Sequence, residues 1–265
     1  MRSAFEIQPD PTFLPGTDPA DTALFLDFDG VLADIVNDPA RVSVEAEVIA
    51  ALGDLSRASG DAVAIISGRE IEQLDAFLSP LRLPAAGIHG LERRNGDGRV
   101  ERQDFDADSL ARIRDAVAEF AGARAGLVAE FKRGSVALHY RNRPETEGEC
   151  LRLADDLESR IKGLKNVRGK MVVEMTLAHR SKADAINDFM REEPFCGRTP
   201  FYFGDDITDE DGFRAVNALG GVSVKIGAGP TVATRRLASP VAFRAWLTAT
   251  ARRWCRSGNT GERRP

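Results

Sequence analysis

Two hydrophobic periodicities alternate in the first and last thirds of the chain. Short continuous apolar runs, typical of strands buried inside a parallel sheet, occupy residues 23–26, 62–66, 85–88 and 201–203, and Val222–Ile226 is predicted as a last strand. Between them, apolar residues recur every three or four positions, and this spacing predicts helices over 44–55, 71–78 and 183–190. Strands that alternate with helices indicate a parallel α/β sheet.

Polar residues and glycine predict where several of these helices begin and end. We place Ser43 as the N-cap of the first helix and Gly60 as its end. Ser181 is placed as the cap of the helix over 183–190. Thr208 and Asp211 have the spacing of a capping box for one more helix.

The middle of the chain has a different pattern. Helical spacing over 110–120 and 151–161 is interleaved with pairs of strand-like runs, which cover residues 127–131, 135–140, 165–167 and 171–175. The order helix-strand-strand-helix-strand-strand predicts a small two-layer α+β unit. The simplest organisation is an α/β core that this unit interrupts.

The domain boundaries follow from this change of pattern. We expect the core to comprise residues 1–107 and 177–265, and the inserted domain residues 108–176. Flexible joints are expected near Asp104–Asp108 and Thr176–His179. A chain of 265 residues with 43% hydrophobic residues is long enough for such a pair of unequal domains.

Charge and cysteine content narrow the class of protein. A net charge of -5 argues against non-specific nucleic-acid binding. The three cysteines are far apart and have no zinc-site spacing, so reduced thiols are expected. No run of apolar residues reaches the length of a signal peptide or a membrane span. We therefore expect a cytoplasmic protein with no membrane partner, acting as a monomer. The basic stretch Arg252–Arg264 is interpreted as a solvated tail.

Polar clusters follow three of the predicted strands, in the segments Asp27-Phe28-Asp29, Ser67-Gly68-Arg69 and Gly204-Asp205-Asp206. Ligands of open α/β sheets bind beyond the carboxyl ends of the strands. Because residues i and i+2 of a strand point the same way, Asp27 and Asp29 are expected to face one site, where Asp205 joins them. Carboxylates at such range need a cation, and oxygen ligands favour magnesium.

A metal-anchored carboxylate cluster suits phosphoryl transfer, in which the protein positions the phosphate and neutralises its charge. One carboxylate can attack phosphorus, while a second protonates the leaving sugar oxygen and then activates water. Lys182 lies in the first turn of a predicted helix, where a cation is unfavourable; a phosphate bound there would explain it. Ser67 offers a hydroxyl and a backbone amide to the same phosphate.

These residues resemble the four successive motifs of haloacid-dehalogenase (HAD) superfamily phosphatases. The matching pieces are Asp27-Phe28-Asp29-Gly30-Val31-Leu32, Ser67, Lys182 and Gly204-Asp205-Asp206-Ile207-Thr208-Asp209. The resemblance implies a Rossmann-like parallel-sheet core with an inserted α+β cap domain of order αββαββ. The superfamily motif often has Thr where this chain has Val31, which removes a hydroxyl but no carboxylate.

The same resemblance implies a role for each motif residue. Asp27 would be the nucleophile and a magnesium ligand, and Asp205 a further ligand. Asp29 would be the general acid and base and would bind the metal through its backbone carbonyl. Ser67 and Lys182 would hold the phosphoryl group. Asp206 and Asp209 would support the site from nearby.

Shorter segments resemble the trehalose-6-phosphate phosphatase family within that superfamily. They are Ile66-Ser67-Gly68-Arg69, Gly87-Ile88-His89-Gly90, Glu130-Phe131-Lys132, His139-Tyr140-Arg141 and Gly204 to Glu210. The resemblance implies hydrolysis of trehalose 6-phosphate, the last step of trehalose biosynthesis, through an aspartyl-phosphate. It implies that the cap residues Glu130, Lys132 and Glu174 contact trehalose hydroxyls. It also suggests further substrate contacts by Arg69, His89 and Arg141.

Three alternatives remain open. The first is another HAD phosphatase acting on sucrose phosphate, a mannosyl phosphate or a hexose phosphate, and the second is a mutase that passes the phosphate to another sugar hydroxyl. The third is a non-catalytic domain that only binds sugar phosphate or a synthase partner, against which the intact catalytic motifs argue. At the level of single residues, His89 is equally explained as a structural histidine, and Glu130 and Lys132 as a solvated strand edge.

Overall fold

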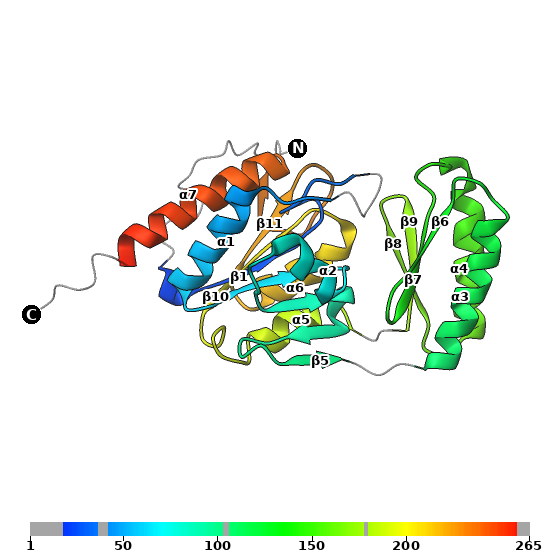
Figure 1. Ribbon diagram of the computed structural model, residues 1–265, viewed down its shortest axis with the longest axis horizontal. Coiled ribbons are helices and arrows are strands. Elements are labelled where there is room, and N and C mark those ends of the chain that lie inside the picture. The colour runs from blue at the N-terminus through cyan, green and yellow to red at the C-terminus, as the bar shows by residue number, and fades with distance from the viewer. Residues whose placement is uncertain (1–17, 37–41, 103–105, 178–179, 259–265) are drawn as a thin grey trace, which may run out of the picture.

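The computed structural model describes residues 18–36, 42–102, 106–177 and 180–258. They form two lobes, each built on its own β-sheet (Figure 1). The strands of the larger lobe are β1 (Thr22–Leu26), β2 (Val63–Ile66), β3 (Ala85–Gly87), β4 (Glu92–Arg94), β5 (Val100–Arg102), β10 (Thr199–Gly204), β11 (Val222–Ile226) and β12 (Arg235–Leu237).

The larger sheet places β1 in its middle. Its strand order is β12-β11-β10-β1-β2-β3-β4-β5. The strands from β12 to β3 are parallel, and only β4 and β5 run antiparallel to their neighbours. Because the carboxyl ends of parallel strands meet at one edge, the residues after β1, β2 and β10 are brought together.

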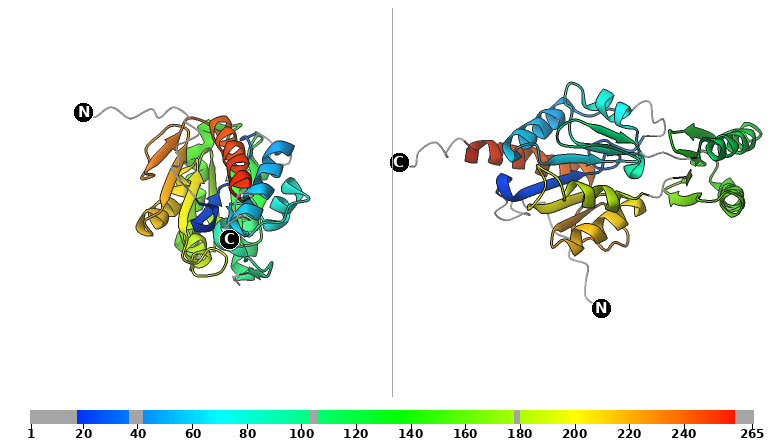
Figure 2. Two further views of the ribbon diagram at one scale, coloured as in Figure 1. Left: turned by 90° about the vertical axis from the view of Figure 1, so that its left-hand side faces the viewer. Right: turned by 90° about the horizontal axis from the view of Figure 1, so that it is seen from below.

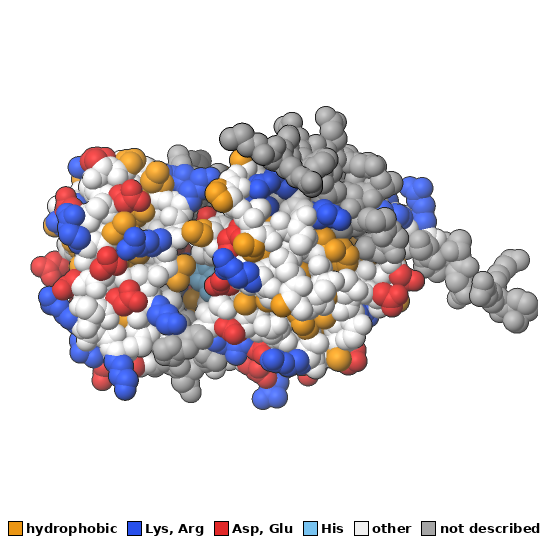
Figure 3. Space-filling view, turned by 180° about the vertical axis from the view of Figure 1, so that it is seen from behind, with side chains coloured by type: hydrophobic (Ala, Val, Ile, Leu, Met, Phe, Trp, Pro, Cys, Tyr) orange, Lys and Arg blue, Asp and Glu red, His pale blue; other side chains and the backbone are white. Residues whose placement is uncertain are grey.

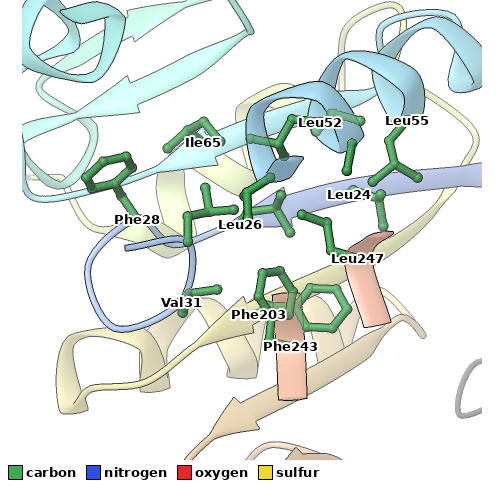
Figure 4. Packing of buried hydrophobic residues seen from close by; sticks show 14 of the residues in the cluster. Leu24, Leu26, Phe28, Val31, Leu52, Leu55, Ile65, Phe203, Phe243 and Leu247 are labelled. Carbon is green, nitrogen blue, oxygen red and sulfur yellow. The ribbon is translucent and has the colours of Figure 1, made fainter. Parts of the chain in front are cut away.

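Helices cover both faces of this sheet (Figure 2). One face carries α1 (Ala46–Ser59), α2 (Ile71–Leu78) and α7 (Pro240–Gly258). The other carries α5 (Lys182–Phe189) and α6 (Glu210–Ala218). Alternate side chains of β1 feed the two cores: Leu26 packs with Leu52 of α1 and Leu247 of α7 (Figure 4), whereas Phe25 packs with Phe189 of α5. Burial on both faces explains the continuous apolar run of this strand.

The smaller lobe is formed by residues 107–176. It contains β6 (Val128–Phe131), β7 (Ser135–His139), β8 (Lys165–Gly169) and β9 (Val172–Thr176) in the antiparallel order β6-β7-β9-β8, with helices α3 (Ala107–Gly122) and α4 (Glu147–Arg160). The helices lie on the outside and the sheet lies toward the larger lobe (Figures 1 and 2). Val136, Leu138 and Val173 pack beneath the helices. The predicted element order and the α/β fold class with an inserted α+β unit are confirmed.

Four short 3-10 turns complete the described structure: η1 (Pro19–Asp21), η3 (Ile88–Gly90), η4 (Pro144–Thr146) and η5 (Ile207–Asp209). The caps agree only in part with expectation. Gly60 ends α1 in the left-handed conformation and Ser181 caps α5, as predicted. The prediction of Ser43 as an N-cap is wrong, because α1 begins two residues later, after Glu45.

The C-terminal region corrects the interpretation of Arg252–Arg264 as a solvated tail. Residues as far as Gly258 belong to α7, and the rest of that stretch lies outside the described residues. Trp254 is only 1% exposed because α7 packs along α1 (Figure 1). Arg252 and Arg256 are exposed on the outward face of this amphipathic helix. Their charges make the apolar stripe on its other face hard to recognise in the sequence.

The cysteines are all described and none forms a disulfide; Cys150 is buried, while Cys196 and Cys255 are exposed. No described helix combines the length and the hydropathy that crossing a membrane requires. The expected joints at 104–108 and 176–179 fall partly outside the described residues, and their flexibility stays a prediction.

Candidate active site

Asp27 lies directly after β1, at the carboxyl edge of the larger sheet. Its backbone N–H donates to the Phe203 carbonyl at 2.9 Å, which holds it beside β10. Its Oδ1 accepts the N–H of Phe28 at 2.8 Å and lies 2.9 Å from Lys182 Nζ. The residue is 5% exposed. Burial and the nearby Asp209 raise the pKa of Asp27 well above its usual range, and Lys182 opposes that rise.

Lys182 is the first residue of α5, and its ammonium is buried between two carboxylates. Nζ lies 2.9 Å from Asp27 Oδ1 and 2.6 Å from Asp209 Oδ1. Burial lowers the pKa of Lys182, but Asp209 and Asp27 outweigh it and raise the pKa above its usual value. These partners compensate for the unfavourable position of a cation at a helix N-terminus. Lys182 is therefore charged and fixed next to Asp27.

Asp209 is the best-connected carboxylate of the site. Its Oδ1 accepts hydrogen bonds from Lys182 Nζ and from the Tyr202 hydroxyl. Its Oδ2 accepts the backbone N–H groups of Asp205 and Asp206, at 2.8 and 2.9 Å. The capping box here pairs Asp206 with Asp209, so the predicted box of Thr208 and Asp211 is wrong by two residues. Sequence reasoning missed Tyr202, because an apolar strand position gives no sign of a hydroxyl aimed at a buried acid.

Asp205 follows β10 and lies across from Asp27. In the described part of the chain, no hydrogen bond or ion pair reaches its carboxylate, although Lys225 Nζ donates to its backbone carbonyl. Burial, followed by the charge of Asp209, raises the pKa of Asp205 to about 7. A partly buried carboxylate without a partner at a site with two other acids is suited to a cation.

The oxygen donors of this cluster fit a hard divalent cation. One carboxylate oxygen from each of Asp27, Asp205 and Asp209 lies within 4.8 Å of the others, and oxygen donors suit magnesium. Both oxygens of Asp209 already accept hydrogen bonds. Asp27 and Asp205 are therefore the carboxylates of the cluster with more capacity to bind a metal.

The side chain of Asp29 pairs with Arg69, whereas it was expected to face the same point as the side chain of Asp27. Its carboxylate accepts two hydrogen bonds of 2.7 Å from Arg69, through Nε and Nη2. Arg69 itself lies over the rings of Phe28 and Phe77. The turn at Gly30 breaks the strand geometry that the i, i+2 argument assumed. Metal binding by Asp29 through its backbone carbonyl stays a prediction.

Replacing Gly30 by alanine is expected to damage this corner of the site. Gly30 has φ +77°, and a Cβ there would overlap the Asp205 carboxylate. We expect Gly30→Ala to lower the free energy of unfolding by about 2–4 kcal/mol, from backbone strain plus the displaced carboxylate. Urea unfolding measures this loss.

Gly98→Ala is the matched control for that experiment. Gly98 also has a positive φ, +84°, but nothing lies within 4 Å of its missing Cβ. It should show only the backbone cost of about 1 kcal/mol. Equal losses in the two variants would contradict the close packing of Gly30 against Asp205.

Ser67 follows β2 and is buried. Its backbone N–H donates to the Ala86 carbonyl at 2.8 Å, and its Oγ accepts the N–H of Arg69 at 3.1 Å. The structure thus brings Ser67 to the same sheet edge as Asp27, as predicted from the strand order. Phosphate binding by Ser67 stays a prediction.

The smaller lobe presents charged residues on the face of its sheet that points away from α3 and α4. Glu174 Oε2 lies 3.1 Å from Lys132 Nζ and 3.3 Å from His89 Nε2 of the larger lobe, and Glu174 Oε1 accepts from Ser135 Oγ at 2.6 Å. Burial raises the pKa of Glu174, but Lys132 and His89 lower it more, below its usual range. The structure thus groups three of the six predicted substrate-binding residues.

Glu130 and Arg141 are placed differently. Glu130 lies on the same sheet face and pairs with His139 Nε2 at 2.9 Å, a hydrogen bond that lowers its pKa. The Arg141 side chain donates to the Lys170 carbonyl at 3.3 Å, beyond the end of β7. In the described residues it makes no contact with the carboxylate cluster.

A hollow separates the two lobes on the surface, and a histidine side chain shows inside it (Figure 3). The larger lobe contributes the carboxylates and Lys182 to this junction, and the smaller lobe contributes the charged sheet face. An aspartate pair after β1, a serine after β2, a buried lysine and acids after β10 thus meet at one edge of a parallel α/β core. This is the arrangement that the resemblance to HAD-superfamily phosphatases implies.

Comparisons with known proteins identify the family to which this chain belongs. The trehalose-phosphatase family model matches residues 25–241. Trehalose-6-phosphate phosphatase of Escherichia coli K12 is 42% identical over 230 residues, which is 85% of each chain. A probable trehalose-phosphate phosphatase of Sinorhizobium fredii is 40% identical over 224 residues, or 84% of each chain. The chain belongs to the trehalose-phosphatase family, whose members are phosphoric monoester hydrolases.

Solved structures share the fold. The C-terminal domain of Candida albicans trehalose-6-phosphate phosphatase superposes with a TM-score of 0.78 at 20% identity, over 88% of this chain and 92% of that one. A HAD-superfamily phosphatase of Bacteroides thetaiotaomicron gives a TM-score of 0.60 at 16% identity, over 91% and 97%. At these identities the likeness concerns the fold alone.

Proposed function

We propose that this protein hydrolyses trehalose 6-phosphate to trehalose and phosphate. The observation that carries the proposal is the buried Asp27, held by Lys182 at the sheet edge that faces a second lobe. The match to the trehalose-phosphatase family over residues 25–241 supports the choice of substrate.

Asp27 is the proposed nucleophile, and the reaction proceeds in two steps. A carboxylate oxygen of Asp27 attacks phosphorus, the bond from phosphorus to the sugar oxygen breaks, and Asp29 gives its proton to that oxygen. Asp29 then takes a proton from water, whose oxygen attacks the phosphorus of the aspartyl-phosphate and releases phosphate. Asp29 is paired with Arg69, so this pair must open for the proton to be delivered.

Lys182 and Ser67 are the proposed phosphate ligands on the protein. The Lys182 ammonium lies beside the attacking carboxylate, where it can neutralise charge on the transferring phosphoryl group. Asp209 keeps Lys182 in this place, since both groups are buried and paired. Because these groups are fixed before substrate arrives, they need little reorganisation in the transition state.

Magnesium is the proposed cofactor, held by Asp27, Asp205 and the backbone carbonyl of Asp29. Bound there, it would supply positive charge to the phosphate oxygens. The absence of a described protein partner for the Asp205 carboxylate supports this assignment, as does its raised pKa.

Residues 108–176 are proposed to act as a cap that recognises the sugar. Glu130, Lys132 and Glu174 lie on the open face of its sheet, and carboxylates and an ammonium can hydrogen-bond several hydroxyls at once. Arg69, His89 and Arg141 remain predicted substrate contacts, of which Arg141 is the most remote. A cytoplasmic, monomeric protein without nucleic-acid or membrane partners also stays a prediction.

A panel of sugar phosphates tests the proposal. We expect kcat/KM for trehalose 6-phosphate to exceed that for glucose 6-phosphate by at least about 100-fold, because a site built on hydroxyl contacts rejects substrates that lack them. Sucrose phosphate and a mannosyl phosphate complete the panel, and phosphate release is the measurement.

The same phosphate-release assay measures the dependence of turnover on the metal. A chelator should abolish turnover, and added magnesium should restore it. Comparable rates on glucose 6-phosphate and trehalose 6-phosphate would contradict the substrate assignment. Phosphate release that persists in the chelator would contradict the cofactor assignment.

A further inference from the structure

The turn that follows β3 has an unfavourable backbone conformation that its neighbours maintain. Ile88 and His89 have φ values of +48° and +54°, a region that a β-branched residue such as Ile88 rarely adopts. Two hydrogen bonds of 3.0 Å hold the turn: the Ile88 N–H donates to the Arg69 carbonyl, and the His89 N–H to the Ser67 carbonyl. The turn is thus attached to the loop proposed to bind phosphate, and such strain tends to be retained at functional sites.

The His89 ring lies against that loop as well. A Cβ added to Gly68 would be 2.8 Å from His89 Nε2, so the ring occupies the space that a larger residue at this position would need. The turn also packs against α5, which begins with Lys182. His89 is therefore in contact with the phosphate side of the site through both its backbone and its side chain.

The same ring reaches the smaller lobe. Its Nε2 is hydrogen-bonded to Glu174 Oε2 at 3.3 Å, and Glu174 lies on β9. Lys132 and Ser135 hold this carboxylate from within the smaller lobe, at 3.1 and 2.6 Å. A second contact, from the Arg133 N–H to Glu70 Oε1 at 3.1 Å, joins the lobes nearby. Glu174 is therefore fixed from two sides, and His89 is its partner in the larger lobe.

We propose that His89 is a positioning residue that sets the distance between Glu174 and the phosphate-binding loop, and that it thereby favours phosphate esters of large sugars over small phosphate esters. The inference rests on the proposed function, because it takes Glu174 as a sugar contact and Ser67 as a phosphate contact. A substrate that spans both groups gains from a correctly placed Glu174. A substrate bound only at the phosphate loop gains nothing from it.

The test compares trehalose 6-phosphate with p-nitrophenyl phosphate, which has no hydroxyl groups for Glu174 to bind. Loss of one hydrogen bond to a charged group predicts that His89→Ala lowers kcat/KM for trehalose 6-phosphate by about 10- to 100-fold, chiefly through KM. The loss for p-nitrophenyl phosphate should be at least about tenfold smaller than the loss for trehalose 6-phosphate. Equal losses on the two substrates would overturn the proposal.

Two further variants separate the imidazole from the backbone. His89→Gly removes the ring and relieves the left-handed strain, so it should lose the same selectivity as His89→Ala. His89→Gln keeps an N–H donor of similar reach and should recover much of the selectivity. If His89→Gly retained wild-type selectivity, the backbone rather than the ring would be responsible, and the proposal would fail.

A double-mutant cycle gives the decisive measurement. The variant His89→Ala with Glu174→Ala should be no less selective than Glu174→Ala alone, because both changes remove one contact. Multiplicative losses would show that His89 acts independently of Glu174 and would refute the positioning role. A wild-type enzyme with no preference for trehalose 6-phosphate would instead contradict the proposed function, so the two failures are distinguishable.

Discussion

Asp27→Asn is expected to reduce phosphate release from trehalose 6-phosphate by at least about 10⁴-fold, the scale seen when a covalent nucleophile is removed. An amide cannot attack phosphorus as the carboxylate does. Of the other two acids in the cluster, Asp209 already accepts hydrogen bonds on both oxygens, and Asp205 is the proposed metal ligand. Single-turnover phosphate release measures the loss.

The fold should survive this change. Asp27 is a buried acid whose pKa burial and Asp209 raise, so its ionised form is held there at a cost in free energy. Removing that charge leaves Lys182 paired with Asp209, and the free energy of unfolding should fall by no more than about 1 kcal/mol. The exposed Asp211→Asn serves as the control, with wild-type turnover expected. Retention of more than a hundredth of the activity by Asp27→Asn would contradict the nucleophile assignment.

Asp27→Asn is expected to remove activity and to leave stability nearly unchanged. Asp209→Asn should instead cause the largest loss of stability among these variants. The carboxylate accepts hydrogen bonds from Lys182 and Tyr202 on one oxygen and from two backbone N–H groups on the other. Whichever way the amide is turned, its NH₂ group faces donors. We expect a loss of about 3–5 kcal/mol in the free energy of unfolding, as for a broken buried ion pair, measured by urea denaturation with a chelator present.

The pH dependence of stability tests whether the charge of Asp209 causes this loss. Burial raises the pKa of Asp209, but Lys182 and the hydrogen bonds lower it more, and the net shift is downward. A depressed carboxyl pKa contributes stability that is present above its unfolded value of about 4 and is lost as pH falls through the folded value. The difference in unfolding free energy between wild type and Asp209→Asn should therefore be large at pH 7 and shrink in acid. A constant difference would contradict the role of the Asp209 charge.

One of the strands that the sequence does not reveal, β4, contains buried charges. The chain at β4 reads Glu92-Arg93-Arg94 and has no apolar run, yet all three residues are buried. Arg94 pairs with Asp75 at 2.7 Å, and Arg93 pairs with Glu192 at 2.7 Å. Hydrophobic periodicity cannot detect a strand whose burial depends on partners distant in sequence. The strand β2 was predictable because all of its residues are apolar.

For the candidate site, the sequence was enough to predict which residue types take part and which strand ends they follow. Asp27, Ser67 and Asp205 meet at one edge, as parallel strand order requires, and Lys182 joins them from the start of α5. The pairing of Asp29 with Arg69, and of Asp209 with Tyr202, was not predictable. Both depend on side-chain orientation after a turn, which local spacing does not specify.

The amino-acid sequence by itself determined the α/β alternation, the inserted α+β unit and the set of acids and the lysine proposed to carry the chemistry, because these follow from periodicity and from where polar residues follow the strands. Only the tertiary structure decided that Asp209 is the hub around Lys182 and that Asp29 is held by Arg69. It alone placed His89 between the phosphate loop and Glu174. These features are contacts between residues 22 to 85 positions apart in the sequence, and they exist only once the sheet and the two lobes are assembled.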